Sequence, residues 1–175
     1  MSKQQKILII VITTIVLIYF AYKAKANYMS EAINEKEEPA TNNFHVENFT
    51  GTPGSKNFSL SEFHCKDGTP VPKALYSNLQ TLINNLQIIR DHIGLPITIN
   101  SGYRTVSHNQ NNGGAPNSMH LQAAAADIVV IGMGASEVRK KIQSLIDAGK
   151  LRNGGIGSYP NFTHYDIGMV RRWTK

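Results

Sequence analysis

The stretch from His120 to Asp127, HLQAAAAD, places one histidine and one carboxylate seven residues apart, with four alanines between them. In one continuous helix the two side chains would lie about 10.5 Å apart along the axis and could not easily bind the same small ion. If the histidine lies in a loop and Asp127 begins the apolar strand that follows, the chain can fold back and bring both side chains together. The first arrangement is an alanine-rich helix, and the second is part of a metal site.

A second polar pair occurs near the end of the chain, in the segment FTHYDIG. Side chains two residues apart in a strand point to the same side, so His164 and Asp166 share one face, and Tyr165 and Ile167 share the other. A catalytic zinc site typically uses three protein ligands and keeps a fourth position open. A strand that carries His164 close to the 120–127 stretch can supply the third ligand.

Apolar periodicity predicts two amphipathic helices. In the segment 72–94, apolar residues recur every three or four positions, Pro72 stands just inside the expected start, and Gly94 suits the end. The segment 135–149 repeats the pattern and also ends in glycine. Short strands are expected within residues 95–104, 126–132 and 154–168. These elements predict an α+β domain, a small antiparallel sheet with helices packed on one side.

The start of the chain carries a separate signal, because residues 7–22 contain no charge and lysines lie on both sides. Sixteen helical residues span about 24 Å, slightly less than a ~30 Å hydrocarbon core. Residues 1–26 are therefore expected to be a membrane anchor, with a signal segment cleaved after Ala26 as the alternative. The domain would be held outside the cytoplasmic membrane by a single span, or exported. Residues 27–56 are expected to form a flexible tether to a domain at 57–175.

The net charge of the chain lies in the expected domain. Residues 1–55 carry five lysines and five glutamates, whereas residues 56–175 carry thirteen basic and seven acidic residues, which accounts for the total of +6. A basic domain favours anionic surroundings such as a wall polymer, although a small excess of lysine and arginine also aids solubility. No motif supports nucleic-acid binding, and none is expected. The single cysteine, Cys65, excludes an internal disulfide and a cysteine-rich zinc site.

Four segments together resemble the M15-type zinc peptidases, which cut D-amino-acid-containing peptides of the bacterial cell wall. The segments are NFSLSEFHCKDGTPVP, SGYRT, GGAPNSMHLQAAAAD and HYDIG, and the resemblance covers residues 57–174. The branch most similar in pattern is the D-Ala-D-Ala carboxypeptidase-like C-terminal domain that also occurs in phage lysins. The resemblance implies the zinc-binding fold shared by these D,D-peptidases and the hedgehog signalling domains.

The resemblance also implies roles for the residues that match the family's motifs. His120, Asp127 and His164 match the zinc ligands. Arg104 matches an arginine that holds a substrate carboxylate or carbonyl, and Ser118 matches a serine that supports the site.

The general base is the point where this chain departs from much of the family. Many members place a glutamate three residues before the last histidine ligand, or a histidine two residues before it, but Asn161 and Phe162 occupy these positions here. Asp166 is then the candidate base, and a competing alignment makes Asp166 the ligand and His164 the base. A second departure is Ala123, where relatives commonly have glycine.

The function that the resemblance implies is zinc-dependent hydrolysis of peptide bonds in peptidoglycan, of the D,D-carboxypeptidase or endopeptidase type. The expected partners are peptidoglycan and, through residues 7–22, a membrane. The alternative is a non-catalytic module that retains zinc and binds or supports the cell wall. The missing glutamate and Ala123 favour this alternative, whereas the intact ligand set and Arg104 favour the enzyme.

Overall fold

The computed structural model describes residues 49–175, so the expected anchor or signal segment and most of the expected tether lie outside the described residues. None of the helices within residues 49–175 is long and apolar enough to cross a membrane. The described end of the tether lies along a long helix: the Gly54 N–H donates to the Gln80 side chain at 3.0 Å, and the Ser55 hydroxyl contacts Gln87 at 2.8 Å.

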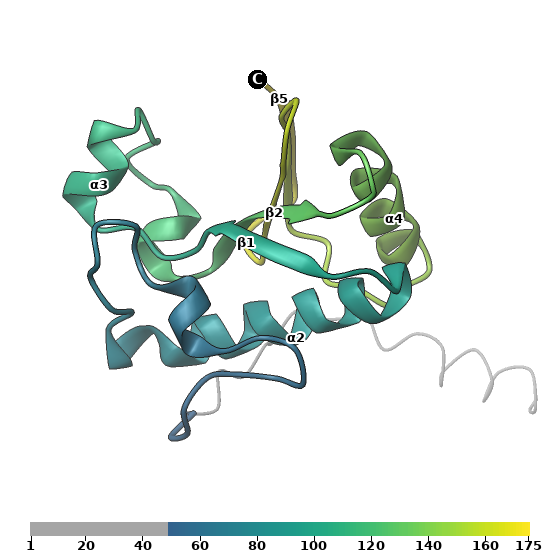
Figure 1. Ribbon diagram of the computed structural model, residues 1–175. Helices are drawn as coiled ribbons and strands as arrows, with labels where there is room; N and C mark the ends of the chain where they lie inside the picture. Colours follow the sequence, from purple (N-terminus) through teal and green to yellow (C-terminus); the bar gives the residue numbers. More distant parts are fainter. Residues whose placement is uncertain (1–48) are drawn as a thin grey trace, which may run out of the picture. The chain divides into compact units, whose positions relative to one another are not determined.

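The domain is α+β, with three α-helices, three short 3-10 helices and five strands in the described residues (Figure 1). The 3-10 helices are η1 (Leu60–Phe63), η2 (Lys73–Leu75) and η3 (Met119–Gln122). The α-helices are α2 (Tyr76–Ile93), α3 (Val106–Asn111) and α4 (Ala135–Asp147). The strands are β1 (Ile97–Ser101), β2 (Ala125–Val130), β3 (Gly155–Ser158), β4 (Thr163–Asp166) and β5 (Arg171–Thr174).

The long helix α2 follows the predicted apolar periodicity. Its buried apolar residues recur every three or four positions, and they are Leu79, Leu82, Ile83, Leu86 and Ile89. Gly94 ends the helix in the left-handed conformation, with φ of 75°, and its N–H donates to the Arg90 carbonyl at 2.8 Å. Burial of each of these aliphatic side chains is worth about 1.5–3 kcal/mol, so this apolar stripe fixes α2 against the sheet.

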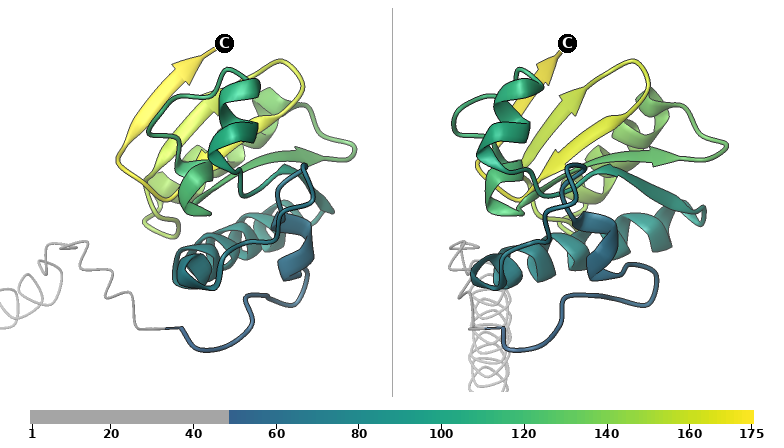
Figure 2. Two further views of the ribbon diagram at one scale, coloured as in Figure 1. Left: turned by 90° about the vertical axis from the view of Figure 1, so that its left-hand side faces the viewer. Right: turned by 60° about the vertical axis from the view of Figure 1, so that its left-hand side comes forward.

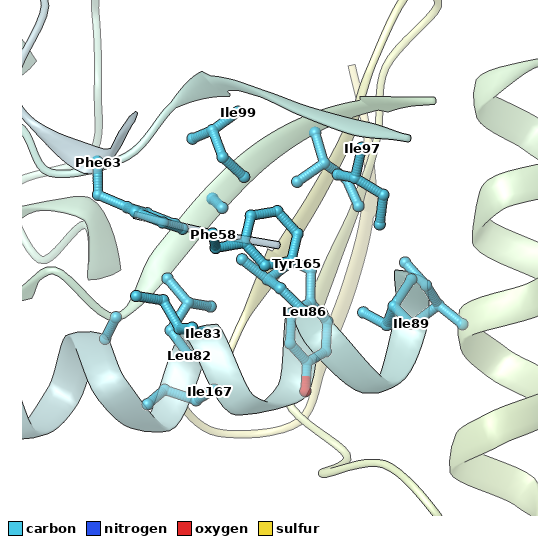
Figure 3. Close-up of a cluster of buried hydrophobic side chains, with 14 of the residues drawn as sticks. Phe58, Phe63, Leu82, Ile83, Leu86, Ile89, Ile97, Ile99, Tyr165 and Ile167 are labelled. Carbon is cyan, nitrogen blue, oxygen red and sulfur yellow. The ribbon is translucent and has the colours of Figure 1, made fainter. Parts of the chain in front are cut away.

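One face of the sheet is apolar and packs on α2 and α4. Figure 3 shows Ile97 and Ile99 of β1 and Tyr165 of β4 pointing toward Leu86 and its neighbours on α2. Further core residues come from β2, β3 and α4, namely Ala126, Ile128, Val130, Ile156, Val138, Ile142 and Leu145. Asp127 of β2 and His164 of β4 alternate with these core residues and therefore face the opposite side of the sheet. The helix α3 lies on that opposite side (Figures 1 and 2).

The sheet differs from the expected one in a single strand. Its order is β1-β2-β4-β3-β5, and the first three pairings are antiparallel, but β5 pairs with β3 in parallel. After β4 the chain reverses through residues 167–170 and passes beyond β3. A strand that runs opposite to β4 is necessarily parallel to β3, because β3 and β4 are themselves antiparallel. The sheet is therefore mixed and not purely antiparallel.

Candidate metal centre

Three side chains from separate elements meet on the polar face of the sheet. His120 lies in η3, whereas Asp127 of β2 and His164 of β4 are directly opposite each other in the β2–β4 register. His120 Nε2 lies 3.2 Å from His164 Nδ1 and 3.3 Å from Asp127 Oδ1, and the last two atoms are 2.9 Å apart. All three residues are buried. The structure thus has the loop-and-strand arrangement, in which His120 and Asp127 do meet.

The donor set fits a zinc ion. Imidazole and carboxylate ligands bind zinc at about 2.0–2.2 Å, which places tetrahedral ligand atoms about 3.3 Å apart. The three ligand atoms of this cluster are separated by 2.9–3.3 Å, so small shifts are enough to coordinate an ion. Three protein ligands leave the fourth position for water or substrate, as in catalytic sites. These three residues are the ligand set that the sequence motifs favoured. The carboxylate of Asp166, the alternative ligand, is not part of the cluster.

His120 is oriented by its own turn and by the β1–α3 loop. Its Nδ1 lies 2.6 Å from the Gly102 carbonyl, so Nδ1 carries the proton and Nε2 is free to bind a metal. Ser118, expected to support the site, caps η3 and accepts from the His120 N–H at 3.4 Å. Ala123 ends η3 in the left-handed region, with φ of 51°. Glycine adopts this conformation without the roughly 1–2 kcal/mol penalty of other residues, which explains why glycine suits this position.

Arg104 contacts the outer oxygen of the acidic ligand. Its Nη2 donates to Asp127 Oδ2 at 2.6 Å, and its Nε donates to Ser101 Oγ at 3.0 Å. Asp127 Oδ1 is left to face the two histidines. The structure therefore places Arg104 where it fixes a ligand, and its partly exposed side chain also lines the cleft.

Asp166 lies behind His164 as seen from the cluster. Asp166 Oδ2 is 3.0 Å from His164 Nε2, on the side of the ring opposite to Nδ1. The same oxygen is 2.7 Å from Arg171 Nη2, and the residue is fully buried. The prediction that Asp166 is the general base stays a prediction, but these contacts favour another role.

Burial and hydrogen bonding set the charges of the cluster. Burial lowers the pKa of His120, which keeps its ring neutral and able to bind a metal. Burial alone would raise the pKa of Asp127, but hydrogen bonds with His120 and His164 outweigh it and lower the pKa. Burial likewise opposes protonation of His164, yet its hydrogen bonds to Asp127 and Asp166 raise the pKa. His120 and Asp127 are thus favoured in the neutral and ionised states that metal binding requires.

The cluster opens into a cleft of about 520 Å³. The loop 112–119 forms one wall, and the β3–β4 turn and β5 form the other. The Tyr159 and Phe162 rings stack on each other with centroids 4.2 Å apart, and Trp173 Nε1 donates to the Tyr159 hydroxyl at 3.3 Å. Of the described residues that line the cleft, Asp127 alone carries a side-chain carboxylate, while the side chains of Arg104, Arg171 and Lys175 are basic. The cleft therefore favours an anionic, partly apolar ligand.

Sequence reasoning did not find the part that β5 plays at this site. The strand β5 is largely exposed and carries two arginines. Trp173 nevertheless packs on the His164 ring, with centroids 5.0 Å apart, and Arg171 reaches Asp166. The two glycines of GGIGS that lie in β3 were the available signal, because they leave room above the strand for these side chains.

A second group of ligand-type side chains, Cys65, Asp67 and His108, lies at the start of α3. The Asp67 carboxylate accepts from the Thr105 hydroxyl at 2.6 Å and from the Thr69 N–H at 2.9 Å. These bonds lower the pKa of Asp67. We therefore assign these side chains a structural role, in which they hold the turn before α3 in place. Cys65 is buried and forms no disulfide within the described residues.

Three histidine and carboxylate ligands at the edge of a cleft are the arrangement that catalytic zinc sites use, and the chain belongs to the peptidase M15 family. The family model, described as Peptidase M15, matches residues 56–166. This match confirms the resemblance drawn from the sequence motifs.

The chain is similar to three curated relatives over part of its length. It is 38% identical over 95 residues to "Probable peptidoglycan L,D-endopeptidase MepK" of Haemophilus influenzae, covering 49% of this chain and 48% of that protein. It is 35% identical over 85 residues to "Peptidoglycan L,D-endopeptidase MepK" of Escherichia coli K12, covering 45% and 43%. It is 35% identical over 92 residues to "Zinc D-Ala-D-Ala carboxypeptidase" of Streptomyces albus G, covering 51% and 35%. The aligned region is thus less than half the length of each relative.

Proposed function

We propose that this chain is a zinc-dependent peptidase that hydrolyses peptide bonds in the stem peptides of bacterial peptidoglycan. The observation that carries the proposal is the buried cluster of His120, Asp127 and His164 at the floor of a basic cleft. The names of the three relatives support the substrate, since two are peptidoglycan endopeptidases and one is a zinc carboxypeptidase.

In this proposal each residue of the cluster and cleft has a separate role. His120, Asp127 and His164 hold the ion, and Arg104 keeps Asp127 Oδ1 turned toward it. When bound, zinc supplies a water of lowered pKa and a Lewis acid for the scissile carbonyl. The Arg104 guanidinium lines the cleft beside this point, where it stabilises negative charge on the reacting carbonyl. The loop 112–119 and the aromatic pair Tyr159 and Phe162 bind the substrate on either side.

The second candidate is a non-catalytic wall-binding module that retains the metal. The absence of a free carboxylate among the described cleft residues favours this candidate, because a general base typically contributes about 10²–10⁴ in rate. The same absence is compatible with an enzyme whose water is deprotonated through zinc alone.

Mass spectrometry of purified peptidoglycan after incubation with the zinc-loaded protein separates these possibilities. A carboxypeptidase releases single terminal amino acids, whereas an endopeptidase releases larger peptides or separates cross-linked stems. We expect new products of one of these two kinds, and we expect a chelator to prevent them. Peptidoglycan that stays unchanged while it retains the protein in a pull-down would support the binding module and contradict the enzyme.

A further inference from the structure

Asp166 is surrounded by hydrogen-bond donors on both oxygens. Oδ2 accepts from His164 Nε2 at 3.0 Å and from Arg171 Nη2 at 2.7 Å. Oδ1 accepts from the backbone N–H groups of Gly155, at 3.2 Å, and Gly168, at 2.8 Å. Because the carboxylate is fully buried and each oxygen already has two donors, neither oxygen is available to a substrate or to a water in the cleft.

The sheet register explains how these groups meet. Asp166 of β4 pairs with Gly155 of β3, and Gly155 pairs in turn with Arg171 of β5. A methyl group on Gly155 would collide with the Asp166 carboxylate, so only glycine leaves room for this carboxylate beside β3, where Arg171 reaches it. Two residues further along β3 the arrangement repeats: Gly157 pairs with His164 of β4 on one side and with Trp173 of β5 on the other.

These contacts fix the orientation of the third ligand. With Nε2–H donated to Asp166, the His164 ring presents Nδ1 to Asp127 Oδ1 at 2.9 Å and to His120 Nε2 at 3.2 Å. Trp173 packs on the same ring and limits its rotation. A carboxylate that accepts from the outer nitrogen of a histidine ligand fixes its tautomer and strengthens metal binding.

We propose that Asp166 is a positioning residue that acts through His164 and is itself held by Arg171, and that it is not the general base. The inference rests on the proposed metal site but not on the identity of the substrate. It also gives β5 a role: the parallel strand at the edge of the sheet delivers the arginine that holds the carboxylate.

The test compares Asp166→Asn with Asp147→Asn, which alters an exposed aspartate on α4, in the full-length protein. We expect Asp166→Asn to weaken zinc binding by about 10–100-fold in a chelator competition, and the control to leave it unchanged. At saturating zinc, turnover of peptidoglycan fragments should stay within about tenfold of wild type. A general base would instead give a loss of about 10²–10⁴ in turnover with unchanged zinc affinity, and that result would overturn the proposal.

A second pair of variants covers the case in which Asp166→Asn does not fold. Arg171→Gln removes a half-exposed side chain and leaves the buried carboxylate in place, whereas Arg172→Gln alters its neighbour, which bonds to Gly154 and Gln143. We expect about tenfold weaker zinc binding for Arg171→Gln alone, the lower end of the range for such contacts. Nitrogen NMR of the zinc-loaded wild type should show His164 protonated at Nε2.

These measurements separate failure of the inference from failure of the proposed function. If both Asp166→Asn and Arg171→Gln bind zinc as wild type does, the positioning role is wrong, although the peptidase can still be active. If wild type binds zinc but leaves peptidoglycan intact, the proposed function fails, and weaker zinc binding by the two variants still supports the positioning role.

Discussion

Replacement of His120 by alanine is expected to weaken zinc binding about 10²–10³-fold and to abolish hydrolysis. The ring is buried, its Nδ1–H is held by the Gly102 carbonyl, and its Nε2 is one of the three converging atoms. Zinc sites of four ligands bind with about 10–16 kcal/mol, or roughly 2.5–4 kcal/mol per ligand, so loss of one ligand weakens binding about 10²–10³-fold. Elemental analysis after dialysis and the rate of peptidoglycan hydrolysis measure the two effects.

The matched control is His92→Ala, which alters an exposed histidine in the last turn of α2. This variant should retain the zinc and the rate of the wild type. Circular dichroism of both variants shows whether the fold is kept, since His120 also packs in the interior. If a chelator competition gives a folded His120→Ala protein the zinc affinity of the wild type, the ion is held elsewhere.

Replacement of Arg104 by lysine is expected to give the second largest loss. The guanidinium bonds to Asp127 through Nη2 and to Ser101 through Nε, and one ammonium group cannot reproduce this fork. Removal of a donor aimed at developing charge typically costs about 10²–10³ in rate. We expect a loss of that order in kcat/KM, with zinc affinity reduced by at most about 10–100-fold because Asp127 is less firmly held.

Arg90→Lys is the control, because it makes the same change of side chain outside the cleft. Arg90 is a residue of α2, and its guanidinium lies over the Phe58 ring. The kcat/KM of this variant should equal that of the wild type. Steady-state kinetics at saturating zinc isolate the catalytic effect from the metal effect. An Arg104→Lys enzyme with unchanged kcat/KM would contradict the proposed role of Arg104 in the reaction.

The two longer helices, α2 and α4, and most strands could be predicted from the sequence because their signals are local. The apolar period of α2 and its glycine end are properties of neighbouring residues, and the alternation around Tyr165 in β4 is as well. The parallel pairing of β5 could not be predicted, because it depends on which strand edge is available after β4 has formed. The short α3 was also missed, since its six residues have no sustained period.

The cluster itself was within reach of the sequence, whereas its surroundings were not. The spacing singled out His120 and Asp127, strand alternation singled out His164, and the resemblance to the family's motifs assigned all three as ligands. Their orientation depends on bonds from distant segments: Gly102 holds His120, and Arg171 holds Asp166. Contacts between distant segments give no regular spacing in the sequence. The position of Asp166 behind His164 could therefore be seen only in the structure.

A zinc titration of the metal-free protein, with hydrolysis of purified peptidoglycan followed in the same samples, is the decisive experiment for the proposed zinc peptidase. If His120, Asp127 and His164 hold one catalytic ion, the rate should rise in proportion to bound zinc and become constant at about one equivalent. Metal-free protein that already hydrolyses peptidoglycan at the full rate would contradict the account, as would protein that binds one equivalent of zinc and leaves every peptide bond intact.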